Sequence, residues 1–96
     1  MNVPPDMPKL TTQELTAQRG TVHGDFTDVS AEAQQMKNIA RTSKNWPNLT
    51  DAQREGIEMI VHKLARILVG DPNHHDHWND IAGYAHIVSI RIPEKE

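Results

Sequence analysis

The chain has 96 residues, which fits one small domain and excludes a multidomain enzyme. It has no cysteine, which excludes disulfide bonds and thiolate chemistry. Its formal net charge of −3 at pH 7 gives no overall positive field for binding nucleic acid or an anionic membrane. Because only 4% of the residues are aromatic, the core has to be mostly aliphatic, and self-association would help so short a chain to be stable.

The N-terminal part of the chain predicts an arm followed by a short helix. Residues 1–10 contain three prolines and no helical periodicity, so we expect a flexible arm outside the domain. Thr11 and Glu14 have the spacing of a capping box, and Gly20 is a typical residue at a helix end. These signals predict a helix over residues 12–19.

A connector and a second helix are expected next. Residues 21–28 are rich in turn-forming types, Gly24 is suited to a positive φ, and Phe26 is expected to lie in the core. Ser30 is a typical helix N-cap, and apolar residues then recur at three- and four-residue steps to about Ser43. This periodicity predicts a helix with one apolar face.

Two longer helices follow. Thr50 and Gln53 form a capping-box pattern at the start of a helix that is expected to end at Val69, before Gly70. The last helix is expected over residues 75–90. Each helix has one apolar arc, and we expect the two arcs to pack against each other. The arcs consist of Ile57, Ile60, Val61, Leu64, Ile67 and Leu68 in the third helix and of Trp78, Ile81, Ala82, Ala85 and Val88 in the last.

These patterns predict an all-α fold, a small helical bundle of three to four helices with two long antiparallel core helices. The single helical domain is expected to span residues 11–92, with a solvated tail at residues 93–96. No apolar run is long enough to span a membrane and no signal peptide is recognisable, so a cytoplasmic location is expected.

Acidic residues and histidines gather on the polar sides of the last two helices. Glu55 and Glu58 project from one side of the third helix, and five potential ligands lie within residues 74–80. Two interpretations stay open, a solvated polar surface with helical ion pairs or a set of ligands for a divalent ion. The ion would be Mg²⁺ or Mn²⁺, and the clustered imidazoles with carboxylates would also suit zinc or nickel. Under the second, the candidate metal ligands are Glu55, Glu58, Asp76, His77 and Asp80. His23 and His86 stand alone in the sequence and are expected at or near the surface.

Two kinds of chemistry are disfavoured. No Ser or Thr stands in a strained glycine turn that would activate it as a nucleophile, and no glycine-rich phosphate loop is recognisable. A bound phosphate would therefore have to meet Lys63, Arg66 or a metal ion. Gly83 lies in the middle of the last helix, where a glycine is either simply tolerated or allows a ligand or another backbone to approach closely.

The segment Lys63–Ala85, which contains DHWNDIAGYA, resembles a family of short phage and prophage proteins of unknown function with the motif KxxRI…DxWxDIAGYA. The segment Arg19–Phe26, RGTVHGDF, is similar to the RGxxYGD element of the same family, with His23 where tyrosine is usual. The resemblance implies a phage-derived helical protein without an established activity. The ligand-binding candidates that it implies are Arg19, Asp25, Lys63, Arg66, Trp78 and Tyr84.

A weaker similarity is to helical nucleoside-triphosphate pyrophosphohydrolases of the MazG type, in which an ExxE and an ExxD motif hold magnesium. Glu55 and Glu58 look like the first motif. The second departs from the pattern, because His77 and Asp80 would supply one nitrogen ligand, which favours manganese or another transition metal over magnesium. The acidic stripes of both helices face away from the predicted core. They could meet only across a dimer interface or around a twisted helix pair.

Two functions remain as hypotheses. The first is a metal- and nucleotide-binding module in which Lys63 and Arg66 neutralise phosphate oxygens; as an enzyme it would be a metal-dependent nucleotide pyrophosphohydrolase. The second is a phage accessory protein without chemistry of its own that binds a host or phage macromolecule, for example as an inhibitor of host defence. The expected partners are a second copy of the chain and a nucleotide or a host or phage protein, with neither nucleic acid nor membrane among them.

Overall fold

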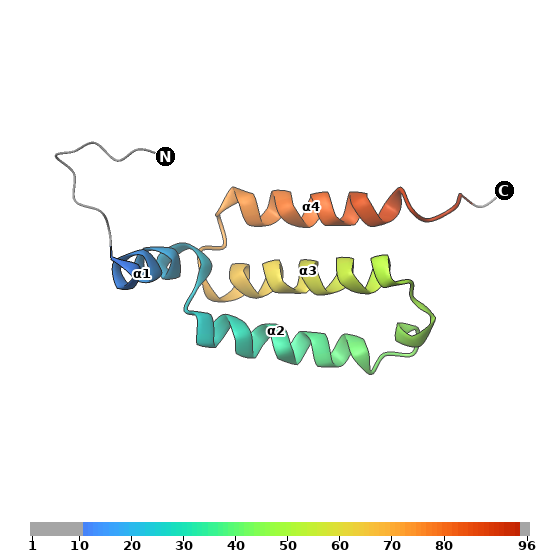
Figure 1. Cartoon of the computed structure of the whole chain (residues 1–96), viewed down its shortest axis with the longest axis horizontal. Coiled ribbons are helices and arrows are strands. Elements are labelled where there is room, and N and C mark those ends of the chain that lie inside the picture. Colours follow the sequence, from blue (N-terminus) through green and yellow to red (C-terminus); the bar gives the residue numbers. More distant parts are fainter. Residues whose placement is uncertain (1–10, 95–96) are drawn as a thin grey trace.

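The computed structural model describes residues 11–94, and over those residues it consists of four α-helices and a short 3-10 helix without any strand (Figure 1). The elements are α1 (Thr12–His23), α2 (Phe26–Arg41), η1 (Trp46–Asn48), α3 (Asp51–Val69) and α4 (His75–Ser89). The predicted all-α fold is confirmed. The arm expected at residues 1–10 lies outside the described residues, as does the end of the expected tail.

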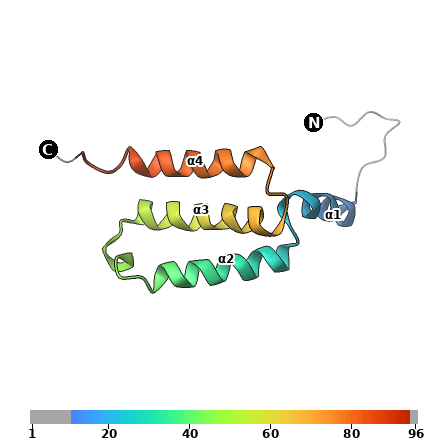
Figure 2. The same ribbon diagram turned by 180° about the vertical axis from the view of Figure 1, so that it is seen from behind.

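Three helices lie side by side in one layer, with α3 between α2 and α4 (Figures 1 and 2). α3 and α4 run antiparallel, as the sequence predicts, and α1 lies at the end of the layer where α3 ends and α4 begins (Figure 1). No further helix of residues 11–94 covers either face of the layer. The bundle is therefore open, and most of its side chains keep some contact with solvent.

The buried core is small and lies mainly between α2 and α3. Val29 and Ala33 of α2 pack with Ala65 of α3, which is fully buried. Towards α4, α3 presents Gly56, where a Cβ atom would overlap the side chain of Val88. Small residues therefore let the helices approach closely, a role that the prediction from apolar arcs did not assign to them.

The connection between α1 and α2 is shorter than predicted. α1 does not end near Gly20 but continues to His23. Gly24, at φ 87°, ends the helix, and its N–H donates to the carbonyl of Gly20 (3.0 Å). The prediction chose the wrong glycine, because both are compatible with a helix end and only the backbone path distinguishes them.

α2 begins earlier than predicted, because Asp25 and not Ser30 is its N-cap. The Asp25 carboxylate accepts a hydrogen bond from the N–H of Thr27 (3.1 Å). Phe26 is then the first residue of α2 and is 77% exposed, so its predicted place in the core is wrong. It lies on the same side of the helix as Val29 but one turn nearer the end, beyond the part of α2 that is buried.

Both ends of α3 agree with the sequence prediction. The N–H of Gln53 donates to Oγ1 of Thr50 (3.1 Å), and the N–H of Thr50 donates to Oε1 of Gln53 (2.9 Å), which completes the capping box. The helix ends at Val69, with Gly70 as its C-cap.

The predicted contact face of α4 is wrong in part. Trp78 is 52% exposed, and Ala82 and Ala85 are exposed as well, whereas His77 is 1% exposed. Leu68, from the predicted arc of α3, is also 65% exposed. The buried and half-buried residues of α4 are His77, Asp80, Ile81, Tyr84 and Val88, which share one face. An imidazole thus takes the buried position that was predicted for the indole, a difference of about 100° around the helix.

Candidate functional site

Backbone contacts fasten the end of α1 to the turn between α3 and α4. The N–H of Asp71 donates to the carbonyl of Val22 (2.9 Å). Gly70 has no space for a side chain, because a Cβ atom there would overlap the carbonyl oxygen of Val22 and the backbone nitrogen of Gly24. This close approach brings His23, the last residue of α1, to the start of α4.

The turn before α4 presents two further imidazoles. Oδ1 of Asp71 accepts a hydrogen bond from the N–H of Asn73 (2.9 Å), which stabilises the turn as an Asx turn. His74 is the N-cap of α4, but its side chain makes no capping hydrogen bond. His77 follows three residues later, so the two imidazoles lie on one side of the first helical turn.

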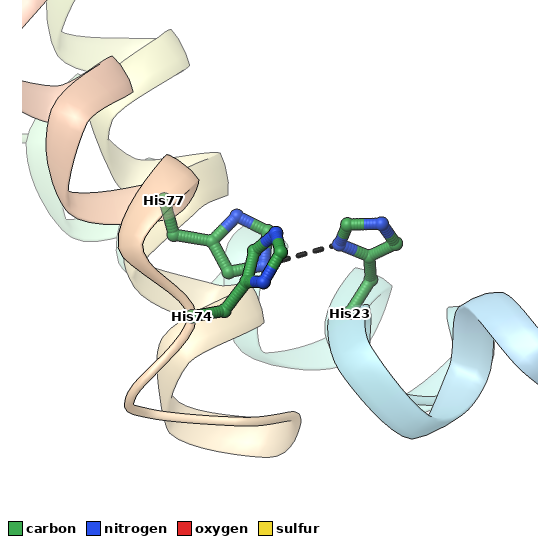
Figure 3. Close-up of side chains that lie close together, drawn as sticks. All are labelled: His23, His74 and His77. Carbon is green, nitrogen blue, oxygen red and sulfur yellow. Dashed lines mark hydrogen bonds between the residues drawn. The ribbon is translucent and has the colours of Figure 1, made fainter.

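The three imidazoles of His23, His74 and His77 meet at this end of the layer and form the histidine cluster (Figure 3). Nδ1 of His23 lies 3.1 Å from Nε2 of His77, and the two share a hydrogen bond. One ring nitrogen from each imidazole lies within 4.8 Å of the other two. His77 is buried and the others are half-buried, so the cluster sits at the edge of the protein interior.

Burial and neighbouring charges favour the neutral form of two of these imidazoles, those of His23 and His77. Desolvation is the main cause that lowers the pKa of His23 below its ordinary value of 6.5, and repulsion from Arg66 adds to it. Desolvation also lowers the pKa of His77, followed by repulsion from His74 and Lys63. A neutral imidazole has one nitrogen lone pair, which it can offer to a proton donor or to a metal ion.

An open groove of about 940 Å³ adjoins the histidine cluster and lies between α1, the start of α2 and α3; it is the α1–α3 groove. Arg19 and Arg66 line it together with His23 and His62. Within residues 11–94, no carboxylate lies within ion-pair distance of either arginine. The exposed ring of Phe26 belongs to the same lining.

Positive charge dominates the α1–α3 groove. Burial lowers the pKa of His62, and the charges of Arg66 and Lys37 lower it further. Asp25 is the acidic residue of the lining, and its carboxylate is engaged as the cap of α2. The groove would therefore attract an anion.

The acidic residues that were predicted to bind a metal pair with basic residues or stay exposed. Glu58 accepts a hydrogen bond from Nε of Arg41 (3.0 Å). Asp80 lies 3.0 Å from Nζ of Lys63, whose hydrogen bond lowers the pKa of that carboxyl. Glu55 is exposed. Each of the two ion pairs joins neighbouring helices of the layer.

Only one of the five predicted ligands lies in a group that could hold an ion. In the part of the chain that the structure describes, the histidine cluster is the one place where three or more potential ligands converge. His77 belongs to it, whereas Asp76 has a 79% exposed side chain and lies 3.7 Å from Nε2 of His74. A site built from the carboxylates of α3 and α4 would need a second copy of the chain, and it stays a prediction.

The residues that were predicted to bind a ligand fall into two groups. Three of them line the α1–α3 groove, namely Arg19, Asp25 and Arg66. The other three lie elsewhere. Lys63 pairs with Asp80, Nε1 of Trp78 donates to the carbonyl of Pro72 (2.8 Å), and Tyr84 is half-buried on α4.

Sequence reasoning placed His74 and His77 together at the start of the last helix but missed the connection of His23 to them. The three-residue step from His74 to His77 is a local signal that they share a helix face. Nothing local relates His23 to them, because it lies 54 residues before His77 and reaches it only through the backbone contacts at Gly70. The expectation that His23 stands alone is therefore wrong.

Comparisons with family models, with curated proteins and with solved structures find no match for this chain. None of the helices in residues 11–94 combines the length and apolar character that crossing a lipid bilayer requires. The function is therefore inferred from the α1–α3 groove and the histidine cluster.

Proposed function

We propose that the chain is a binding module for phosphate-bearing small molecules, with a nucleotide as the class of ligand that fits best, in the cytoplasm of a bacterial host. The observation that carries this proposal is the lining of the α1–α3 groove. Two guanidinium groups without a carboxylate partner among residues 11–94 share that lining with an exposed phenyl ring.

The charged part of the lining suits a phosphate group. Guanidinium groups bind phosphate oxygens with two parallel hydrogen bonds, and Arg19 and Arg66 approach the groove from different helices, α1 and α3. His62 adds a neutral imidazole that can donate an N–H to the same anion.

The apolar part of the lining suits a base. Phe26 is 77% exposed, and an aromatic ring of this kind can stack on any nucleobase. The groove volume of about 940 Å³ is close to the upper end of the range of about 300–1,000 Å³ for small-molecule sites. A mononucleotide therefore fits the groove in size as well as in chemistry.

Binding is the proposed function, and hydrolysis would be an addition that depends on a dimer. A pyrophosphohydrolase would need a magnesium or manganese site, and the acidic side chains of α3 and α4 do not converge within residues 11–94 of one chain. The uncovered faces of the layer support a dimer, because apolar side chains on them would gain burial against a second copy.

Titration calorimetry with ATP, pyrophosphate and adenosine tests the proposal. We expect ATP and pyrophosphate to bind and adenosine to bind much more weakly, because it has no phosphate. Arg66→Ala should weaken ATP binding by at least about 10-fold, since a hydrogen bond to a charged group contributes about 1.5–3 kcal/mol. Phe26→Ala should weaken the binding of ATP but not that of pyrophosphate.

Lys44→Ala is the matched control, because Lys44 is an exposed basic residue outside the groove. It should leave the binding of ATP within about 2-fold, as expected of a surface change away from the site. The proposal is wrong if neither ATP nor pyrophosphate binds at millimolar concentration, or if Arg66→Ala and Lys44→Ala have equal effects.

A second candidate function is that of a non-enzymatic accessory protein that binds a host or phage protein. It is supported by apolar side chains exposed along α4 and just after it, namely Trp78, Ile87, Ile90 and Ile92, each of which is 47–64% exposed. Ile87→Glu should abolish such a contact, whereas Asn79→Glu at an exposed polar position should not. Light scattering on the purified chain would distinguish the two uses of this surface. A dimer mass would indicate self-association, whereas a monomer mass would leave the surface for a different protein.

A further inference from the structure

The histidine cluster has the donor set of a transition-metal site. Its ring nitrogens come from the end of α1, from the N-cap of α4 and from the first turn of α4. We infer that His23, His74 and His77 bind one divalent ion of the zinc class, with a coordination position left open for water or a ligand. This site differs from the carboxylate set predicted on α3 and α4, and it does not depend on nucleotide binding.

The distances are close to those that zinc requires. Zinc–nitrogen bonds of about 2.0–2.1 Å in tetrahedral geometry place ligand nitrogens about 3.3 Å apart. Nδ1 of His23 and Nε2 of His77 are 3.1 Å apart, so their separation is already close to this value. The proton that they share has to leave the donating nitrogen, so that each nitrogen offers a lone pair to the ion. The third nitrogen lies within 4.8 Å of both. His74 has a half-buried side chain without a capping bond, and its ring already packs against the rings of His23 and His77, with ring centres 5.6 Å and 4.8 Å apart.

The protonation state of two of the imidazoles supports a bound cation. The lowered pKa values of His23 and His77 keep the imidazoles in the neutral form that metals bind. Lys63 and Arg66 oppose a cation, and two carboxylates act in the opposite sense. Asp80 raises the pKa of His77, although less than Lys63 and Arg66 lower it, and Asp76 lies 3.7 Å from Nε2 of His74. A carboxylate beside a ligating imidazole is the usual partner that orients it.

The donor type selects the ion. Three imidazole nitrogens suit zinc, cobalt, nickel and copper, whereas magnesium and calcium prefer oxygen ligands. With three protein ligands, the site has the pattern of open zinc centres and not that of closed structural ones, which have four.

Metal binding would also fix α1 in place. No residue of α1 is buried, and its C-terminal end contacts Gly70, Asp71, His74 and His77. An ion bound by His23 and by two residues near the start of α4 would join these parts of the chain directly. We therefore expect zinc to slow amide hydrogen exchange in α1.

Calorimetry and thermal unfolding with zinc chloride test the inference on the full chain. We expect one zinc ion per chain and a melting temperature that rises by about 10 °C or more when free zinc is 100-fold above Kd. Magnesium chloride should cause no such rise. Cobalt chloride should give the visible absorption bands of a four-coordinate ion.

Two substitutions remove a ligand and preserve the local structure. His23→Gln keeps a group that can hydrogen-bond to His77. His74→Asn introduces a better N-cap for α4, so the metal-free variant should melt at the same temperature or higher. Each should weaken zinc binding by more than about 100-fold, beyond the effect of losing an outer-shell partner. His75→Asn is the control, since His75 is an exposed neighbour that lies outside the cluster. The His75→Asn variant should bind zinc with the same affinity as the original chain.

The inference is overturned by any of three results. The first is the absence of stoichiometric zinc binding at millimolar zinc. The second is unchanged zinc affinity in folded His23→Gln and His74→Asn. The third is zinc binding that leaves hydrogen exchange in α1 unaltered, which would place the ion elsewhere on the chain.

Discussion

Two polar regions of the molecule differ in how their side chains are satisfied. Along the layer, Glu58 and Asp80 each lie beside a basic residue of a neighbouring helix, Arg41 and Lys63. At the end of the layer, the histidine cluster gathers three potential ligands of one kind, with no basic side chain hydrogen-bonded to any of them among the described residues. The first region resembles an ordinary charged surface, and the second has the composition of a binding site.

The comparison shows that a high density of ligand types in the sequence does not by itself make a site. The acidic stripes were the stronger sequence signal, yet side-by-side packing of the helices pairs Glu58 with Arg41 and Asp80 with Lys63 and leaves Glu55 and Asp76 exposed. The imidazoles converge because backbone segments touch at Gly24 and Gly70, where side chains are missing. Close backbone approach, which hydrophobic periodicity does not report, therefore decides where the ligands meet.

The largest effect is expected from a side chain placed at that contact. In Gly70→Ala the new Cβ atom would overlap the backbone of Val22 and Gly24, which cannot move without displacing α1. We expect a loss of about 1–3 kcal/mol in the free energy of unfolding, and weaker zinc binding, because His23 would move away from α4. Urea denaturation and zinc calorimetry measure the two effects.

Gly83→Ala is the control for this prediction. The space around Gly83 is open within the described chain, so alanine in this helix should stabilise the protein by up to about 1 kcal/mol. Equal effects of Gly70→Ala and Gly83→Ala would contradict the account of the contact. A loss of self-association in Gly83→Ala would instead indicate that a second copy packs there.

An intermediate effect is expected from pH. The pKa values of His23, His62 and His77 are lowered in the folded chain, whereas unfolded histidines titrate near 6.5. The unfolded state therefore binds more protons as the pH falls below about 6.5. The free energy of unfolding should thus decrease from pH 7.5 to pH 5.5 without metal. His23→Gln should reduce this slope, and stability that increases on acidification would refute the prediction.

The smallest effect is expected from the paired acids. Arg41 and Glu58 are partly exposed, with side chains 42% and 24% accessible, so their attraction is screened by water. A double-mutant cycle with Arg41→Ala and Glu58→Ala should give a coupling energy below about 1 kcal/mol that decreases further in high salt. A coupling of several kcal/mol would mean that this pair is more than a surface contact.

Most of the fold could be predicted because its signals are local. The capping box of Thr50 and Gln53 and the end of α3 at Gly70 need only a few neighbouring residues to be recognised. The rotation of α4 could not be predicted in the same way. Trp78 and Ala82 are as apolar as the residues that face inward, so apolar character alone does not set the rotation of the helix. The rotation depends on the burial of His77, which results from packing against residues distant in the sequence.

The candidate site was predictable only in fragments. The sequence pointed to His77 and, through the resemblance, to Arg19, Asp25 and Arg66, which line one groove. It did not relate the groove to the histidine cluster, because His23, which belongs to both, had no local signal of importance. Such a residue is identified by three-dimensional proximity alone.

The backbone contact at Gly24 and Gly70 belongs to the scaffold, and the imidazoles of the histidine cluster are side chains attached next to it. Main-chain atoms make the closest contacts at Gly70, so the half-buried positions 23 and 74 can be exchanged without dismantling the junction, whereas His77 is buried and orients α4. A chain built in this way could carry other side chains at positions 23 and 74 and acquire a new ligand specificity while keeping the same architecture. Diversity among related sequences would then concentrate at those two positions and spare the two glycines.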